Sequence, residues 1–377
     1  YELIAPWGPL SSFGGAATPP GLAQPHPADP GSAPVRVEST QPPIPNPPEN
    51  PEPHTPGSGC HRLADSGPFR MTEESAPVGA PTRAGYVALV GRPNAGKSTL
   101  MNALVGERLS IVTSKAQTTW TRVTGIRSED GVQIIFLDTP GLLAVRDLHQ
   151  RAMLEEAHEA LREADAVLLL LDGARPLDAA EEGVVRAALE ETRAPVRIAL
   201  NKIDRLEEGA VAELAERAGE AFGAPVHPIS AREGLGLGPL LEDVSSLLPE
   251  SPFLYPEDDV ASQPVRFFVA EMVRETVFEQ FGEEIPYSTV ATVGDFREGE
   301  DPVYIQVTLH VESKSQKGIL IGKGGKAIRA LGAASRKKIE TFLDRRVYLD
   351  LWVKPLAGWR RKRQHLRRLG YRVPEET

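Results

Sequence analysis

Residues 91–98 read Gly-Arg-Pro-Asn-Ala-Gly-Lys-Ser, the complete G-x-x-x-x-G-K-S pattern of a phosphate-binding loop. An apolar run at 86–90 precedes the pattern, and a helical stretch at 99–105 follows it. A strand therefore leads into a tight turn whose backbone N–H groups face a phosphate chain, and the next helix directs its positive end at the same anion. The pattern predicts that Lys97 reaches the β- and γ-phosphates and that the Ser98 hydroxyl ligates Mg²⁺.

Composition divides the chain unevenly. Its 377 residues predict about two or three domains. Residues 1–70 contain 17 of the 34 prolines and eight glycines, so we expect 1–80 to be a disordered Pro/Gly-rich extension. The chain begins with Tyr1, and Met71 stands before a short polar lead into the first strand, which suggests that 1–70 is an upstream extension or a mis-assigned start. The single cysteine, Cys60, excludes a disulfide within the chain and predicts a reducing compartment. No apolar run approaches the ~20 residues of a membrane span.

Charge is also unevenly distributed. Residues 314–373 carry 18 Lys and Arg against three acidic residues, a net charge of +15 within a chain whose total is −10, so the remainder sums to −25. A basic C-terminal block on an acidic protein favours a polyanionic partner at that end.

Apolar strand patterns alternate with amphipathic helical patterns over residues 84–250. The expected strands are 86–90, 133–138, 166–172, 196–201 and 225–229, and the expected helices between them include 148–164, 178–192 and 211–222. This alternation predicts a three-layer α/β fold with a mixed, mostly parallel sheet, in which 123–127 pairs antiparallel with 133–138.

Further polar motifs follow the strand ends, where ligands of such sheets bind. Asp138-Thr139-Pro140-Gly141 predicts a carboxylate that holds Mg²⁺ through water and a glycine amide close to the γ-phosphate, although the motif alone is also typical of an ordinary turn. Asn201-Lys202-Ile203-Asp204 predicts a guanine site, because the Asp carboxylate can accept from both N1–H and N2–H₂. A backbone N–H of Ser230-Ala231-Arg232 is expected to donate to guanine O6, although this motif alone is weak.

Two positions bear on catalysis. The loop Lys115-Ala-Gln-Thr-Thr-Trp120 offers Thr119, or as second choice Thr118, to complete the Mg²⁺ shell. Leu142 follows Gly141 where many GTPases carry a Gln that orients the attacking water, so we expect slow hydrolysis that a partner or RNA raises. The predicted catalytic residues are Lys97, Ser98, Thr119, Asp138 and Gly141. The predicted nucleotide contacts are Gly91, Arg92, Pro93, Asn94, Ala95, Gly96, Lys97, Ser98, Asp138, Thr139, Pro140, Gly141, Leu142, Asn201, Lys202, Ile203, Asp204, Ser230 and Ala231.

A second domain is expected over 264–377, after a Pro-rich acidic linker at 251–263. A helix at 265–281, strands at 287–295 and 303–311, a helix at 326–343 and a strand at 347–353 surround the segment Gly322-Lys323-Gly324-Gly325-Lys326. This G-x-x-G loop and its surroundings resemble an α+β type II KH domain, whose glycines let nucleic-acid phosphates approach. The basic end, 359–371, adds cations and aromatic rings.

The order of nucleotide motifs resembles that of translation-factor-like GTPases, and their pairing with a KH domain resembles the Era family of bacterial ribosome-assembly GTPases, over roughly 84–373. The resemblance implies binding of GTP, GDP and Mg²⁺, contact with the 3′ region of 16S ribosomal RNA, a role in 30S subunit assembly and 16S rRNA processing, and loose association with the cytoplasmic face of the membrane. It implies a cytoplasmic monomer that binds RNA and not DNA. The family usually has Arg where this chain has Trp120, so a role for that Arg does not carry over.

Two alternatives remain beside this interpretation. A passive RNA-binding assembly protein with a slow or inactive nucleotide domain is consistent with Leu142. A GTPase for RNA modification usually brings a further domain with a reactive cysteine, and Cys60 lies in the Pro/Gly-rich extension.

Overall fold

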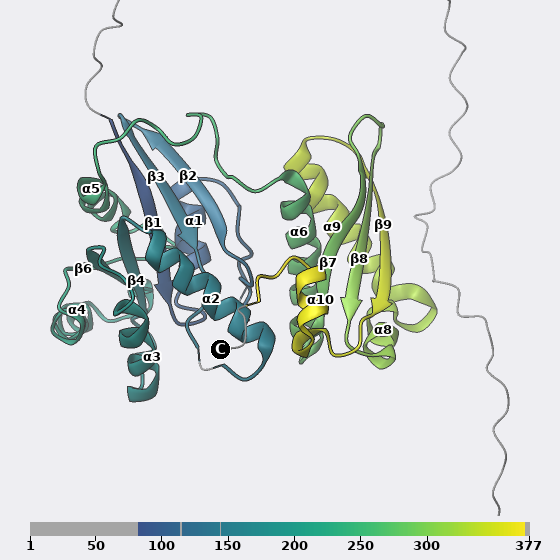
Figure 1. Cartoon of the computed structure of the whole chain (residues 1–377), viewed down its shortest axis with the longest axis horizontal. Coiled ribbons are helices and arrows are strands. Elements are labelled where there is room, and N and C mark those ends of the chain that lie inside the picture. The colour runs from purple at the N-terminus through teal and green to yellow at the C-terminus, as the bar shows by residue number, and fades with distance from the viewer. Residues whose placement is uncertain (1–81, 114, 144, 374–377) are drawn as a thin grey trace, which may run out of the picture. The chain divides into compact units, whose positions relative to one another are not determined.

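A six-stranded sheet forms the centre of the first domain (Figure 1). The structure is a computed structural model that describes residues 82–113, 115–143 and 145–373, all of which belong to one compact unit. The predicted extension at 1–80, with Cys60 and Met71, lies outside the described residues. The strands are β1 (Arg83–Gly91), β2 (Val123–Glu129), β3 (Val132–Asp138), β4 (Ala166–Asp172), β5 (Val196–Asn201) and β6 (Val226–Pro228).

The sheet has the order β2-β3-β1-β4-β5-β6, and every neighbouring pair is parallel except β2 with β3. The predicted mixed, mostly parallel sheet with an antiparallel edge is confirmed. Strand β1 lies between β3 and β4, so the connection after β1 runs to one side of the sheet and the connection after β3 runs to the other. Ligands of such sheets bind at the carboxyl ends of the strands at this point.

Helices cover both faces of this sheet (Figure 1). Val87 and Leu89 of β1 pack in one buried cluster with α1 (Lys97–Val105) and α5 (Leu237–Leu247). Ala88 and Val90 pack on the other side with α2 (Leu148–Glu163), α3 (Ala179–Leu189) and α4 (Glu208–Phe222). Burial on both faces explains why these strands read as continuous apolar runs. Helix α5 was not among the elements predicted by name.

The N-termini of these helices differ in a way that matters for ligand binding. Asp147 caps α2 by accepting a hydrogen bond from the Gln150 amide (2.8 Å), and Asp178 caps α3 in a capping box with Glu181. Helix α1 instead begins after Gly96, which has φ 101° and offers no side-chain cap. The first amides of α1 are therefore left to a ligand.

The predicted linker packs against the first domain. The amides of Leu254 and Tyr255 both donate to Gln133 Oε1 of β3, at 2.8 and 3.0 Å. Val260 accepts from the Ile126 amide at 2.9 Å, so the segment also lies along the edge strand β2.

The second domain has a three-stranded sheet, β7-β8-β9, with β7 and β8 antiparallel and β8 and β9 parallel. Apolar residues on one face of this sheet pack in a single core with α6, α8 and α9. The elements are α6 (Val265–Gln280), α7 (Ile285–Ser288), β7 (Val290–Arg297), β8 (Val303–Val311), α8 (Lys314–Ile321), α9 (Lys326–Leu343), β9 (Val347–Pro355) and α10 (Arg363–Arg368).

One predicted element is wrong at its start. The expected strand at 287–295 begins instead at Val290, because the chain forms the short helix α7 before it. Pro286 stands in the first turn of α7, where its missing N–H costs nothing and its fixed φ favours a helix. None of the described helices is both long and apolar enough to span a membrane.

Candidate nucleotide site and nucleic-acid clamp

The loop between β1 and α1 folds around the Lys97 side chain. Lys97 Nζ donates to the carbonyl oxygens of Gly91 (3.2 Å) and Arg92 (3.1 Å), and the residue is only 6% exposed. Burial lowers the pKa of Lys97 to about 8, and the nearby charge of Asp138 opposes that shift. The ammonium is thus placed where an anion would strengthen its charged form.

Three oxygen-bearing side chains converge beside this loop. Ser98 Oγ donates to Asp138 Oδ2 at 2.7 Å and lies 3.0 Å from Thr119 Oγ1, while Thr119 Oγ1 donates to the same carboxylate oxygen at 3.3 Å. Asp138 is fully buried, and its Oδ1 has no hydrogen-bond partner among the described residues. Burial raises the pKa of Asp138, and the charge of Lys97 is the main opposing effect, followed by the hydroxyl donors.

This cluster fits Mg²⁺. Hydroxyl and carboxylate oxygens are the hard ligands that Mg²⁺ prefers, and a divalent cation would compensate a buried carboxylate with an unpartnered oxygen. Ser98 and Thr119 would hold the ion directly and Asp138 through water. When bound, the ion would neutralise charge on the β- and γ-phosphates.

Gly141 approaches the phosphate-binding loop too closely for any side chain. A Cβ at this position would lie 2.6 Å from the backbone nitrogen of Pro93. The next residue, Leu142, donates its amide to Gly91 O at 3.0 Å, and its side chain is buried in the core with Val90 and Leu137. Leu142 therefore braces the loop through its backbone while its side chain points into the protein.

Asn201 joins the base-recognition loops to the phosphate-binding loop. Its Nδ2 donates to Ala95 O (2.8 Å), and its Oδ1 accepts from the amides of Lys202 (2.8 Å) and Ala231 (3.0 Å). The predicted bracing by Asn201 thus has a geometric basis. One amide of Ser230-Ala231-Arg232 is expected to donate to guanine O6. In this structure the Ser230 amide donates to Leu235 O (3.0 Å) and the Ala231 amide to Asn201 Oδ1.

Asp204 is positioned by a neighbour from the next loop. Ser230 Oγ donates to Asp204 Oδ1 at 2.6 Å, so this hydrogen bond leaves the other carboxylate oxygen, Oδ2, able to accept from a ligand. Lys202, at φ 69°, places its Nζ 2.6 Å from both Asn94 O and Asp172 Oδ2. These contacts anchor the Asn201–Asp204 segment to the phosphate-binding loop and to the ends of the neighbouring strands.

A cavity of about 550 Å³ collects most of the predicted residues. The predicted residues on its wall are Pro93, Asn94, Gly96, Lys97, Ser98, Thr119, Gly141, Asn201, Lys202, Asp204 and Ala231, together with the second choice Thr118. The others support the wall from behind or lie beside it: Gly91, Arg92, Ala95, Asp138, Thr139, Pro140, Leu142, Ile203 and Ser230.

Some side chains differ from what the motifs alone suggest. The Arg92 guanidinium is buried and pairs with Glu181 of α3 at 3.3 Å. Thr139 Oγ1 donates to Leu89 O at 2.7 Å. Wall residues that sequence reasoning missed include Thr99, Val112 and Arg205, while Arg232 belongs to the predicted Ser230-Ala231-Arg232 motif. Only Thr99 carried a signal, because it follows Ser98 directly in the first turn of α1.

The loop that carries Thr119 is tied to the second domain. Arg274 of α6 donates to the Thr118 carbonyl oxygen, and Lys115 Nζ donates to the carbonyl oxygens of Phe278 and Phe281 at the end of the same helix. Trp120 is 3% exposed and packs beside His149 and Trp359.

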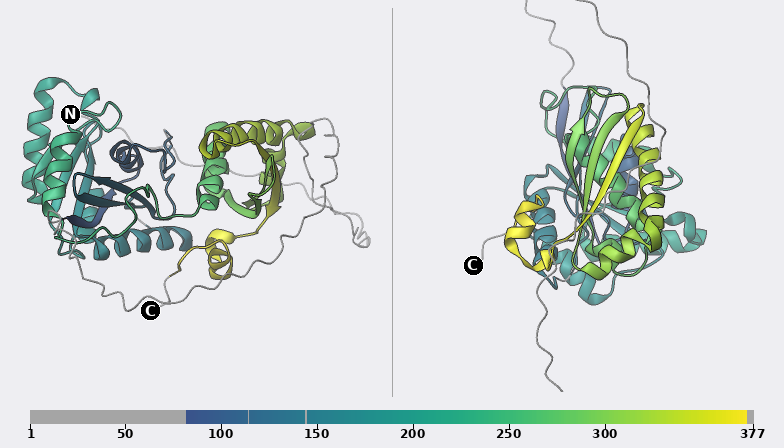
Figure 2. Two further views of the ribbon diagram at one scale, coloured as in Figure 1. Left: turned by 90° about the horizontal axis from the view of Figure 1, so that it is seen from above. Right: turned by 90° about the vertical axis from the view of Figure 1, so that its right-hand side faces the viewer.

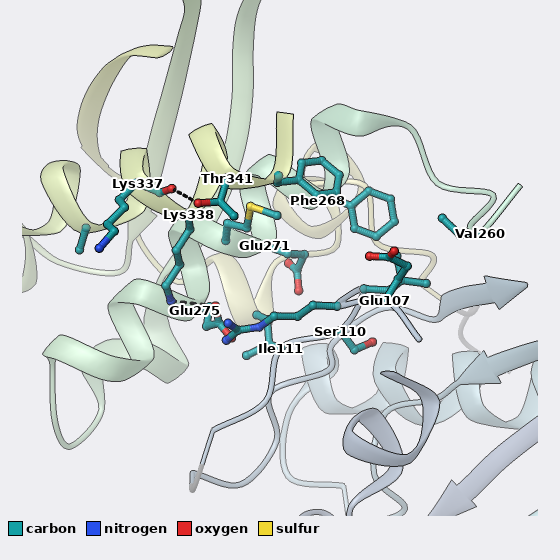
Figure 3. Close-up of a pocket in the computed structure, with 15 residues that line it drawn as sticks. Glu107, Ser110, Ile111, Val260, Phe268, Glu271, Glu275, Lys337, Lys338 and Thr341 are labelled. Atoms are coloured by element: carbon teal, nitrogen blue, oxygen red, sulfur yellow. Dashed lines mark hydrogen bonds and ion pairs between the residues drawn. The ribbon is translucent and has the colours of Figure 1, made fainter. Parts of the chain in front are cut away.

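A second cavity, of about 630 Å³, lies between the loop after α1 and helices α6 and α9 (Figure 3). Glu275 on its wall pairs with two cations: its Oε1 accepts a hydrogen bond from Arg108 at 2.6 Å, and its Oε2 accepts one from Lys338 at 2.8 Å. The Arg108–Glu275 pair joins the loop after α1 to α6, and the Lys338–Glu275 pair joins α6 to α9.

The G-x-x-G loop forms the turn between α8 and α9. Gly322, Gly324 and Gly325 all have positive φ (70°, 61° and 75°), and a Cβ on Gly322 would lie 2.7 Å from the Ala327 side chain. Lys323 and Lys326 are exposed on either side, and α9 starts after Gly325 with no side-chain cap. Backbone amides and two ammonium groups therefore face solvent where a phosphate could bind.

Two residues that flank this loop, Ile319 and Arg329, also shape it. Ile319, the first residue of the Ile-Leu-Ile run at 319–321, is 46% exposed beside the loop and offers an apolar contact. Arg329 was not singled out, yet it donates to Gly324 O at 2.7 Å and so fixes the turn.

The site and fold define a P-loop nucleotide hydrolase joined to a nucleic-acid-binding KH domain. The family described as "50S ribosome-binding GTPase" matches residues 86–202, and the family described as "KH domain" matches residues 284–360. Two curated relatives carry both parts. GTPase Era of Halothermothrix orenii is 40% identical over 291 residues, which are 77% of this chain and 99% of that protein. GTPase Era of Nitratidesulfovibrio vulgaris is 41% identical over 298 residues, covering 76% and 96%.

Solved structures agree with this assignment. A variant of Aquifex aeolicus Era bound to GDP and AlF₄⁻ matches with a TM-score of 0.75 and 35% identity, over 78% of this chain and all of that one. A structure of Era in complex with MgGDPNP and nucleotides 1506–1542 of 16S ribosomal RNA matches with the same TM-score and 34% identity, over the same shares. The chain belongs to the GTPase Era family. It is a GTP hydrolase that uses GTP, GDP and Mg²⁺.

Proposed function

We propose that this GTPase binds the 3′ region of 16S ribosomal RNA through the Gly322–Lys326 loop and acts in 30S subunit assembly and 16S rRNA processing in the cytoplasm. The observation that carries the proposal is the hydrogen bond from Arg274 to the Thr118 carbonyl. It joins the first helix of the RNA-binding domain to the residue before the candidate Mg²⁺ ligand Thr119. Nucleotide state and RNA binding can therefore bias each other.

The residues act in the following roles. Backbone amides of the loop at 91–98 hold the phosphates, Lys97 neutralises charge that develops on them, and Ser98, Thr119 and Asp138 orient Mg²⁺. Asp204 selects guanine by accepting from two adjacent N–H groups, and Asn201 keeps its loop in register with the phosphate-binding loop. Gly141 lets its amide approach the γ-phosphate.

Leu142 sets the expected rate. Its buried side chain has no group that orients water, so the free protein should hydrolyse GTP slowly, and the ribosomal subunit or its RNA should raise the rate. The same burial favours a second candidate, a passive RNA-binding assembly protein whose nucleotide domain is a structural element. We place the protein in solution as a monomer, with loose association to the membrane face as in its family.

The test measures GTP turnover of the full chain alone, with 30S subunits, and with an RNA of the 3′ region of 16S rRNA. The proposal expects slow turnover alone and clear stimulation by either addition. A Lys323→Asp/Gly324→Asp variant, altered at two exposed clamp positions, should keep the basal rate and lose the stimulation. No stimulation together with unchanged RNA binding would favour the passive candidate, and equal RNA affinity with GDP and with a non-hydrolysable GTP analogue at fixed salt would contradict the coupling.

A further inference from the structure

The KH sheet has an outer face that none of the roles above uses. Helices cover the face formed by Val303, Ile305, Val307, Leu309 and Val311 of β8 and their neighbours on β9. Because side chains alternate along a strand, the opposite face carries the other residues. On β8 they are Tyr304, Gln306, Thr308 and His310, and in register on β9 they are Tyr348, Asp350, Trp352 and Lys354. The right-hand view of Figure 2 looks onto this sheet from the side away from α6.

Aromatic rings on this outer face lie in an ordered array. Tyr304 and Tyr348 are nearly parallel, with ring centroids 5.8 Å apart and an interplanar angle of 15°. Trp352 follows on β9, two strand positions after Asp350, on the same face. All three rings are half-buried, so each is fixed at its base and still reachable from solvent.

Each end of the array carries a cation over a ring. The Arg297 guanidinium lies 4.7 Å from the Tyr304 ring centroid, and Lys354 Nζ lies 5.2 Å from that of Trp352. Both side chains are exposed, Arg297 at 54% of its side chain. Arg297 also pairs with Asp295 at 2.8 Å and with Glu300 at 3.3 Å. Lys354 is therefore the cation of the array that can turn toward a phosphate when a base takes its place on the ring.

Asp350 holds the array together and leaves one oxygen unused. Its Oδ2 accepts from the Tyr304 hydroxyl (3.2 Å) and from Trp352 Nε1 (2.9 Å). The residue is 2% exposed, and Oδ1 has no hydrogen-bond partner among the described residues. Asp350 therefore acts by fixing the Tyr304 and Trp352 side chains relative to each other, and the half-buried rings rather than the carboxylate are what a ligand can reach.

We propose that this outer face is a second RNA site, on which single-stranded bases stack on Tyr348 and Trp352 while Lys354 contacts the backbone. Rings with cations beside them are the combination that binds single strands without strict sequence preference. Strand β9 of this face, with Tyr348, Trp352 and Lys354, belongs to the segment 314–373, whose net charge of +15 suits a polyanion. The site extends the proposed RNA-binding function to a surface separate from the clamp.

The experiment removes the clamp first. In the full chain with Lys323→Asp/Gly324→Asp, an RNA strand of about 20 nucleotides, long enough to cover more than one stacking site, is titrated while tryptophan fluorescence and anisotropy are recorded. We expect residual binding that quenches Trp352, with the quenching lost in Trp352→Phe while binding persists. Tyr348→Ala and Trp352→Ala should each weaken that binding about tenfold, the loss typical of one stacked base.

Matched variants separate stacking from folding and from charge. Phe342→Ala removes another exposed aromatic ring, on α9 and outside this face, and should leave the residual binding unchanged. Lys354→Glu reverses the charge beside the Trp352 ring at an exposed position, so it should weaken binding while the melting temperature changes by no more than the loss of one exposed cation–π contact.

The proposal is overturned if the clamp variant shows no residual binding, or if a duplex of the same sequence binds equally well. Equal binding by Tyr348→Ala and its parent would also overturn it and would leave the surface to a protein partner. None of these outcomes touches the proposed function, because clamp binding is measured separately in the parent chain.

Discussion

The guanidinium of Arg274 lies 4.3 Å from the ring centroid of Trp120 and donates a hydrogen bond to the carbonyl oxygen of Thr118. Arg274 itself is 3% exposed and forms an ion pair with Glu271 at 3.0 Å. One buried side chain of the KH domain thus contacts both neighbours of Thr119, the Thr118 backbone on one side and the Trp120 ring on the other. A loop that is fixed in this way keeps a candidate Mg²⁺ ligand in place without further cost at the moment of reaction.

Replacing Arg274 should therefore slow hydrolysis. In Arg274→Met the volume is kept and both contacts are lost, so Thr119 is less often in position. We expect single-turnover GTP hydrolysis to fall about tenfold, the effect of roughly 1.4 kcal/mol in the barrier, and the apparent requirement for Mg²⁺ to rise. Arg266→Ala, on the same helix and over Phe296 at 5.7 Å, is the matched control and should leave both quantities unchanged. Equal rates in the two variants would show that Arg274 does not position the loop.

Gly141 should tolerate no side chain. In Gly141→Ala the new Cβ would lie 2.6 Å from Pro93 N and 2.8 Å from Pro93 Cα, both backbone atoms of the phosphate-binding loop. The loop must shift, so we expect GDP affinity measured by calorimetry to fall at least about tenfold, which is the result of a 1.4 kcal/mol cost. Gly183→Ala in α3 meets nothing within 4 Å and should raise the free energy of unfolding by about 0.5–1 kcal/mol. Unchanged GDP affinity in Gly141→Ala would contradict the close approach.

The nucleotide domain was readable from sequence because each of its signals is local. Strands such as Ala166–Asp172 and Val196–Asn201 are buried on both faces, so they stand out as apolar runs, and the motifs occupy their carboxyl ends. The sheet order then follows from few topological choices. The α+β arrangement of the second domain was predicted for the same reason, with strict alternation in Val303–Val311.

What sequence could not provide are the contacts made across long separations. The pairing of Arg92 with Glu181 and the hydrogen bond from Ala231 to Asn201 depend on loops that meet only after folding. Trp120 was noted only as a departure from its family, and its packing against Trp359 required the fold. The helix at Ile285–Ser288 was missed because four residues carry too little periodicity to distinguish a helical turn from a strand.

Nucleotide binding should take up a proton in mildly alkaline solution. Burial lowers the pKa of Lys97 to about 8 in the free protein, and bound phosphates favour the charged ammonium and so raise that pKa. Between the two pKa values the free protein carries fewer protons than the complex, so GDP affinity should fall as pH rises above about 8, by at most about tenfold per pH unit. Calorimetry at alkaline pH in buffers of different ionisation enthalpy measures the uptake directly. Lys97→Arg, charged throughout this range, should bind less tightly but without uptake, and equal uptake in that variant would assign the proton elsewhere.

Burial of His149 should make the fold sensitive to acid. The ring is 2% exposed and lies 4.8–4.9 Å from the rings of Trp120, Trp359 and Tyr371. Burial, together with the charges of Arg360 and Arg274, lowers the pKa of His149 from 6.5 to about 3.

Since the folded state keeps this histidine neutral, the unfolded chain binds one proton more between about pH 3 and 6.5. The free energy of unfolding should therefore decrease as pH falls below about 6.5, with a limiting slope of about 1.4 kcal/mol per pH unit from this group. His149→Phe keeps an aromatic ring in the cluster but removes the titrating group. Its free energy of unfolding, measured with urea between neutral pH and about pH 5, should therefore lack this contribution to the pH dependence. His158→Asn removes a histidine that pairs with Glu191 at 2.7 Å near the surface and serves as the control. If His149→Phe and the parent chain lose stability with the same slope, the acid sensitivity resides in the carboxylates.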